Sequence, residues 1–198
     1  MKKTMLTAAG LLACAATGYA FTDEGSRRFS EFLSGLKEAP AVVSTTGNGS
    51  FQATVSRDGT EINYELTFRE LEGDVRQAHI HIGLPQNAGG IVLWLCDSEA
   101  NPSPLATTPP CTQNDPMDLR SGRVTGTLTA ADVQNLAANG IAGPTATTPG
   151  EFEEVVALIK AGKTYANVHS ASFPAGEIRS QLDNRGNEHN DHGGHNDH

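Results

Sequence analysis

The chain has 198 residues, which is the length of one domain with extensions at its ends. It carries 14 lysines and arginines against 23 aspartates and glutamates, a net charge of −9. This acidic balance argues against a nucleic-acid binder and against a polybasic membrane-surface protein. Since no apolar stretch reaches the roughly 20 residues of a transmembrane helix, the sequence indicates one acidic domain without a membrane span.

Residues 1–20 have the parts of a secretory signal peptide. Lys2 and Lys3 form a positive beginning, an apolar run follows, and the small residues Gly18 and Ala20 precede a cleavage point before Phe21. We therefore expect an exported protein, periplasmic, at the cell surface or secreted, with residues 21–28 as a linker.

The three cysteines fit an exported chain. Cys14 lies in a Leu-Leu-Ala-Cys segment similar to a lipobox, so it is a candidate lipidation site and the alternative to cleavage before Phe21. Cys96 and Cys111 flank a proline-rich and threonine-rich segment, and an oxidising compartment favours a disulfide between them. Such a bond would close a loop of about 15 residues and contribute about 3 kcal/mol.

The middle of the chain has the pattern of an all-β, antiparallel sandwich or barrel. The clearest signal is an Asp-Gly turn at Asp58 and Gly59 between two segments of alternating polarity. Eight strands are predicted, over residues 29–36, 49–56, 61–70, 75–82, 91–96, 122–128, 164–170 and 177–182. Two short helices are predicted, one over residues 130–138 after an N-capping Thr129 and one over residues 151–161.

All seven histidines fall into two groups. Four recur at every third position of the polar tail, residues 183–198, which we expect to be disordered: His189, His192, His195 and His198. Histidine-rich tracts are typical of metal binding, and imidazole suits copper and zinc. A solvated acidic tail is the alternative.

The other three histidines form the candidate site. His79 and His81 are two residues apart on a predicted strand, so both side chains point to the same face. His169, on a later strand, is the third candidate ligand for copper or zinc. Three imidazoles with an open position are typical of a catalytic or exchangeable metal site. Because ligation requires neutral imidazoles, we expect binding to weaken below about pH 6.5.

Two further interpretations stay open for this region. The three histidines are alternatively structural, with their ring nitrogens hydrogen-bonded in a polar corner. Glu177 and Arg179 share a face of the last predicted strand. They are candidates for an ion pair, for outer groups that fix a histidine tautomer, or for a solvated edge, and the structural interpretation is favoured.

Residues 29–182 resemble the CHRD domain, named after chordin. The resemblance is carried by Phe-Leu-Ser-Gly at residues 32–35 with Glu-Ala-Pro at residues 38–40, by Ala-His-Ile-His-Ile-Gly at residues 78–83, and by Tyr-Ala-Asn-Val-His-Ser at residues 165–170. The segment Pro-Ala-Gly-Glu-Ile-Arg-Ser-Gln-Leu at residues 174–182 completes it. The resemblance implies an exported, immunoglobulin-like β-sandwich, and the signature histidines of the family fall on the same three residues as the candidate site.

The function expected from these observations is metal binding rather than catalysis. A non-metal structural or adhesive module that binds an extracellular protein partner is the first alternative. A redox metalloenzyme is the second, because copper/zinc superoxide dismutase has a similar His-x-His strand. This chain lacks the further metal-binding histidines of that enzyme within its domain, so the likeness does not carry the activity over.

Overall fold

A computed structural model describes residues 27–183 of the chain, and their fold is almost entirely β-structure. The eight strands are β1 (Arg28–Ser34), β2 (Asn48–Val55), β3 (Ile62–Arg69), β4 (Val75–Ile82), β5 (Gly90–Cys96), β6 (Gly122–Leu128), β7 (Thr164–Ser170) and β8 (Ile178–Gln181). The helical elements are α1 (Phe152–Lys160) and the 3₁₀ turns η1 (Gly35–Lys37), η2 (Ala130–Asp132) and η3 (Ala137–Asn139).

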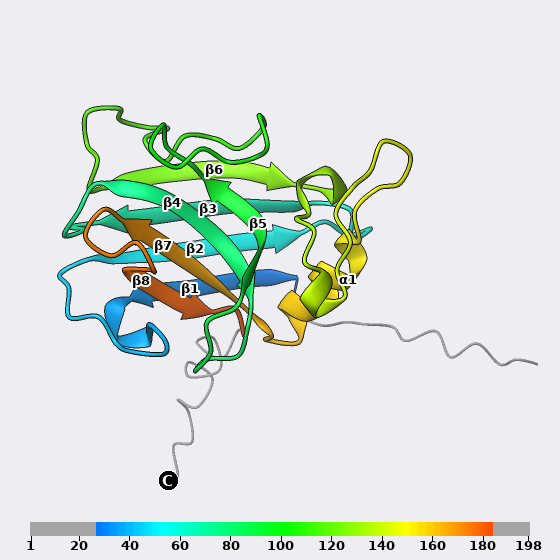
Figure 1. Ribbon diagram of the computed structural model, residues 1–198, viewed down its shortest axis with the longest axis horizontal. Coiled ribbons are helices and arrows are strands. Elements are labelled where there is room, and N and C mark those ends of the chain that lie inside the picture. Colours follow the sequence, from blue (N-terminus) through cyan, green and yellow to red (C-terminus); the bar gives the residue numbers. More distant parts are fainter. Residues whose placement is uncertain (1–26, 184–198) are drawn as a thin grey trace, which may run out of the picture.

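The eight strands form one antiparallel sheet in the order β5-β4-β7-β8-β1-β2-β3-β6. Figure 1 shows the sheet folded over on itself, with β4, β5 and β7 crossing in front of β2, β3 and β6. Apolar residues from every strand meet in a single core between these layers. The expectation of an all-β antiparallel sandwich or barrel with one or two short helices is therefore confirmed.

Alternating polarity places the strands as the sequence predicted. In β3, Ile62, Tyr64, Leu66 and Phe68 are all buried, whereas the residues between them face outward. At the turn before β3, Gly59 has a φ of 76°, which favours glycine, and Asp58 accepts a hydrogen bond from the Thr60 N–H. Sequence alternation and the turn residue thus fix this hairpin together.

Strands β4, β7 and β8 depart from simple alternation because both of their faces are covered. Every residue of β7 is buried, including the polar Thr164, Asn167 and His169. The inner face packs into the core, and loops lie over the outer face. This covered outer face holds the candidate site.

The helix expected over residues 130–138 is wrong, whereas the helix expected over residues 151–161 is confirmed as α1. Thr129 does cap, through a capping box with Asp132, but the helical turn ends there. Val133 then takes extended backbone angles, is buried in the core, and is followed by Gln134, whose N–H donates to the carbonyl of Val92 on β5. Burial of Val133 and pairing with β5 outweigh the local helical preference.

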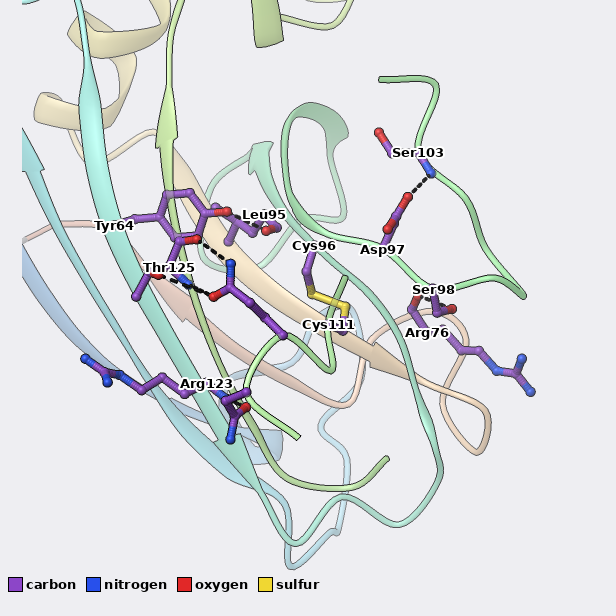
Figure 2. Close-up of a disulfide and its surroundings, with 12 residues drawn as sticks. Tyr64, Arg76, Leu95, Cys96, Asp97, Ser98, Ser103, Cys111, Arg123 and Thr125 are labelled. Carbon is purple, nitrogen blue, oxygen red and sulfur yellow. Dashed lines mark hydrogen bonds between the residues drawn. A yellow bond between two sulfur atoms is a disulfide. The ribbon is translucent and has the colours of Figure 1, made fainter. Parts of the chain in front are cut away.

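The disulfide expected between Cys96 and Cys111 is present, with an S–S distance of 2.01 Å. It ties the end of β5 to the loop that precedes β6 (Figure 2). Nearby, the hydroxyl of Tyr64 on β3 donates to the carbonyl of Leu95, so the edge strand β5 is also joined to β3 across the fold.

Several expectations fall outside the described residues. These are the signal peptide at residues 1–20, the candidate lipidation site Cys14, residues 21–26 of the linker, and the tail histidines His189, His192, His195 and His198. Within residues 27–183, no helix has the length and apolar character needed to cross a membrane.

Candidate metal site

The three histidines of the domain lie together on the outer face of two neighbouring strands. His79 and His81 belong to β4, and His169 belongs to β7, which pairs directly with β4. The ring centroids are 5.3 Å apart for His79 and His81, 5.0 Å for His79 and His169, and 5.8 Å for His81 and His169. One ring nitrogen from each residue lies within 4.8 Å of the other two.

Aromatic rings enclose this cluster. His79 is fully buried, and its ring meets the indole of Trp94 edge-on at 4.3 Å between centroids. The ring of His81 lies parallel to that of Tyr165, at 4.7 Å. His81 and His169 each keep only 6% of their surface exposed. The site is therefore a nearly dry corner of the protein.

Hydrogen bonds to backbone carbonyls set the tautomers of two of the rings. Nδ1 of His81 lies 3.0 Å from the carbonyl oxygen of Gly89, and Nδ1 of His169 lies 3.0 Å from that of Pro174. Because a carbonyl oxygen can only accept, both Nδ1 atoms donate, and the neutral rings carry their lone pairs on Nε2. A backbone carbonyl on the second nitrogen is the usual arrangement for a metal-binding histidine.

The remaining ring nitrogens are buried and have no hydrogen-bond partner among the described residues. They are Nε2 of His81, Nε2 of His169 and both nitrogens of His79. Buried polar atoms of native proteins nearly always have partners, and each one left unmatched costs about 1–3 kcal/mol. Ring nitrogens that converge without donors to satisfy them indicate a site built for another group.

Burial also keeps these imidazoles neutral. Together with the neighbouring His169 and His81, it lowers the pKa of His79 from 6.5 to about 2. Burial lowers the pKa of His81 to about 4, against the opposing effect of its hydrogen bond to Gly89. The pKa of His169 is lowered in the same way. Neutral imidazole is the form that ligates metals, so the ligand state persists well below pH 6.5.

The residues present fit a copper or zinc ion. Metal–nitrogen bonds of about 2.0–2.1 Å place the nitrogens of a three-histidine site about 3.4 Å apart. The three candidate nitrogens lie within 4.8 Å of one another, so the most distant pair would have to approach by at most about 1.4 Å. Rotation about the soft χ2 bond supplies such movement, and His79 has no hydrogen bond within residues 27–183 that the rotation would break.

Comparison with known proteins gives the family of this chain. The model of the CHRD domain matches residues 29–182. The chain belongs to the CHRD family. No curated protein and no solved structure matched it.

Glu177 and Arg179 of this CHRD domain are buried and point to different partners. Oε1 of Glu177 accepts from the Thr45 hydroxyl at 2.6 Å and from the Glu72 N–H at 2.7 Å, so it joins two loops to β8. Arg179 donates to the carbonyls of Leu84 and Asn87. The tautomers of His81 and His169 are set instead by the two backbone carbonyls described above.

Sequence reasoning missed several groups that complete the site. Tyr165 and Asn167 share the outer face of β7 with His169, and Nδ2 of Asn167 donates to Oε1 of the buried Glu38 at 2.7 Å. The guanidinium of Arg179 lies 3.3 Å from the centre of the Tyr165 ring. The period-2 alternation of residues 165–169 indicates which of these side chains share a face. Glu38 stands in the Glu-Ala-Pro segment of the family resemblance, but its contact with Asn167 leaves no signal in the alternation.

Proposed function

We propose that this CHRD protein binds one copper or zinc ion on His79, His81 and His169. The observation that supports it is the convergence of buried ring nitrogens, within 4.8 Å of one another, that have no partner among residues 27–183. Carbonyls already hold the other nitrogens of His81 and His169. A bound ion would replace three costly unmet acceptors with three coordinate bonds.

The structural alternative accounts for these contacts less well. Histidines that only hold strands together are expected to be hydrogen-bonded through their ring nitrogens. His79 instead is fully buried, and neither of its ring nitrogens has a hydrogen-bond partner in the described part of the chain. The desolvation of its ring lowers the stability of a domain without metal, and a ligand that binds the folded state recovers that loss.

The proposal includes export and a role for the tail. The signal-like segment at residues 1–20 supports an exported protein, at the cell surface, in the periplasm or secreted. The tail histidines His189, His192, His195 and His198 would collect ions near the domain. An exported, acidic module that captures transition-metal ions is thus the function that we assign.

Metal uptake by the purified full chain tests the proposal. A chain in which the four tail histidines are alanine isolates the domain site, and we expect it to bind one copper or zinc ion. His81→Ala in that background should abolish stoichiometric uptake. Gln77→Ala is the matched control, because Gln77 lies on the same strand and pairs with His169 without being a ligand, and it should bind like the parent.

The outcomes separate the alternatives. If the tail variant takes up no metal in calorimetry and His81→Ala lowers only the thermal stability, the histidines are structural and the module is a structural or adhesive one. If the metal-loaded chain turns over a redox substrate, the redox metalloenzyme alternative replaces simple binding. His81→Gln serves as a second variant should His81→Ala fail to fold.

A further inference from the structure

The three candidate ligands offer a bound ion no negative charge. All three candidate ligands are neutral imidazoles, and His79, His81 and His169 are 0%, 6% and 6% exposed. The rings packed against them, Trp94 and Tyr165, are uncharged as well. Any ion bound there brings its whole charge into a nearly dry environment.

The positive charge of Arg179 lies close to the site, against the ring of Tyr165. In the order β4-β7-β8, Tyr165 lies between His81 and Arg179. The His81 ring stacks on Tyr165 from the side of β4, and the guanidinium of Arg179 lies 3.3 Å from the centre of the same ring. The positive charge of Arg179 acts on His81, where it disfavours a second positive charge.

The nearby carboxyl groups lie outside the set of candidate ligands, although the buried Oε2 of Glu177 has no hydrogen-bond partner within residues 27–183. Oε1 of Glu177 accepts from the Thr45 hydroxyl and the Glu72 N–H, on loops that hold no candidate ligand. Oε1 of Glu38 accepts from Asn167, and the charges that act on this carboxyl are those of Arg179 and Glu177. Neither carboxylate is among the groups that could hold the metal with the three histidines in residues 27–183.

The free-energy cost of burying an ion distinguishes univalent from divalent metal ions. The Born penalty rises with the square of the charge, so a divalent ion without an anionic ligand pays about four times the penalty of a univalent one. Zinc and cupric copper would need a hydroxide or another anion beside the imidazoles. Cuprous copper is satisfied by three nitrogen ligands in one plane.

We propose that the three-histidine site selects copper in its univalent, cuprous state over zinc and over cupric copper. The proposal rests on the metal-binding function proposed above and names the ion. The neutral ligands, the dry surroundings and the positive charge of Arg179 each disfavour a divalent ion more than a univalent one.

The single tryptophan of the chain provides a specific reporter. Trp94 is the only tryptophan, and its indole touches the His79 ring. Copper bound at the site should therefore quench its fluorescence. The experiment uses the full chain with the four tail histidines changed to alanine, titrated without oxygen. Cuprous copper is supplied from a chromophoric cuprous chelator, and zinc and cupric copper are titrated separately.

We expect one equivalent of cuprous copper, quenching of Trp94, and an affinity about 1,000-fold or more above that for zinc. Arg179→Met should reduce this preference about tenfold, whereas Arg179→Lys, which keeps the charge but loses the same planar contacts, should retain it. Should neither variant fold, the ratio of the affinities of the parent for cuprous copper and for zinc still tests the proposal. Equal or tighter binding of zinc or cupric copper would overturn the cuprous proposal and leave the metal-binding function standing. No binding of any of the three ions would overturn both.

Discussion

The imidazole of His81 lies flat on the ring of Tyr165, with 4.7 Å between centroids and an angle of 2° between the planes. Gly89 holds both partners, because its carbonyl accepts from Nδ1 of His81 and its N–H donates to the Tyr165 hydroxyl at 2.9 Å. The plane and the tautomer of His81 are therefore fixed by the protein before any ligand arrives. Such preorganisation lowers the entropy lost on binding.

Tyr165→Ala should weaken metal binding by about 10–100-fold, the range found for groups that orient metal ligands. Tyr165→Phe keeps the stacked ring and loses only the hydroxyl bond to Gly89, so its effect should be smaller. Fluorescence titration of Trp94 in the chain with the tail histidines changed measures both. Equal losses in the two variants would show that stacking does not orient His81.

Metal bound by the domain should survive at pH 5. Burial holds the pKa of His79 at about 2 and that of His81 at about 4, so both rings stay neutral there. Histidines in open solvent are mostly protonated at pH 5, because they titrate near 6.5. The sequence predicted that binding weakens below about pH 6.5; for this buried site we expect it to weaken only at more acidic pH.

Metal content after dialysis of the full chain at pH 7 and pH 5 checks this. We expect several ions per chain at pH 7 and one at pH 5, with the last ion absent in His81→Ala. Complete release between pH 7 and pH 6 would mean that the bound ions sit on exposed histidines and not in the domain.

The sequence predicted the strands and the histidine triad more fully than the surroundings of the triad. Periodicity of two puts His79 and His81 on one face, and the strand predicted over residues 164–170 coincides with all seven residues of β7. The pairing of β4 with β7 is a long-range contact that alternation alone does not give; the family resemblance implied the three histidines but not this pairing. The loop carbonyls of Gly89 and Pro174 carry no side-chain signal, so their role in orienting the rings required coordinates.

Glu38→Gln should stabilise the protein at pH 8. Burial raises the pKa of Glu38 from 4.5 to about 7. Between these values the folded state holds a proton that the unfolded state has lost, so this group's contribution to stability is full below pH 4.5 and is lost as the pH rises through 7. Glutamine stays neutral, and its Oε1 can still accept from Asn167.

The expected gain in the free energy of unfolding is on the order of 3 kcal/mol at pH 8 and close to zero at pH 4.5. Urea unfolding of the parent and the variant at both pH values measures it. Glu61→Gln, an exposed position on the β2–β3 hairpin, is the control and should show no such dependence. A gain of the same size at both pH values would mean that the effect is one of packing and not of protonation.

Loss of the Cys96–Cys111 disulfide should lower the free energy of unfolding by about 3 kcal/mol, the chain-entropy value for a loop of this length. The bond closes a separation of 15 residues between β5 and the approach to β6. Cys96→Ser with Cys111→Ser removes both thiols, and denaturant unfolding beside the parent measures the change. Peptide mapping without reductant should recover the linked pair from the native protein. Two free, alkylatable thiols in protein taken from its own compartment would contradict the pairing.

Export should leave a chain that begins at Phe21. Lys2, Lys3 and the apolar run to Ala20 motivate this prediction, which concerns residues outside the described part of the chain. The intact mass of the protein recovered from outside the cytoplasm measures the start of the chain. A diacylglycerol-modified Cys14 would instead show lipoprotein processing and a membrane-anchored module. An exported chain that retains residues 1–20 would contradict both forms of processing. Lys2→Glu with Lys3→Glu removes the positive beginning that a signal peptide needs, so it should slow export in either case. Arg57→Glu with Lys163→Glu, the same total charge change at two exposed positions of the folded domain, should not.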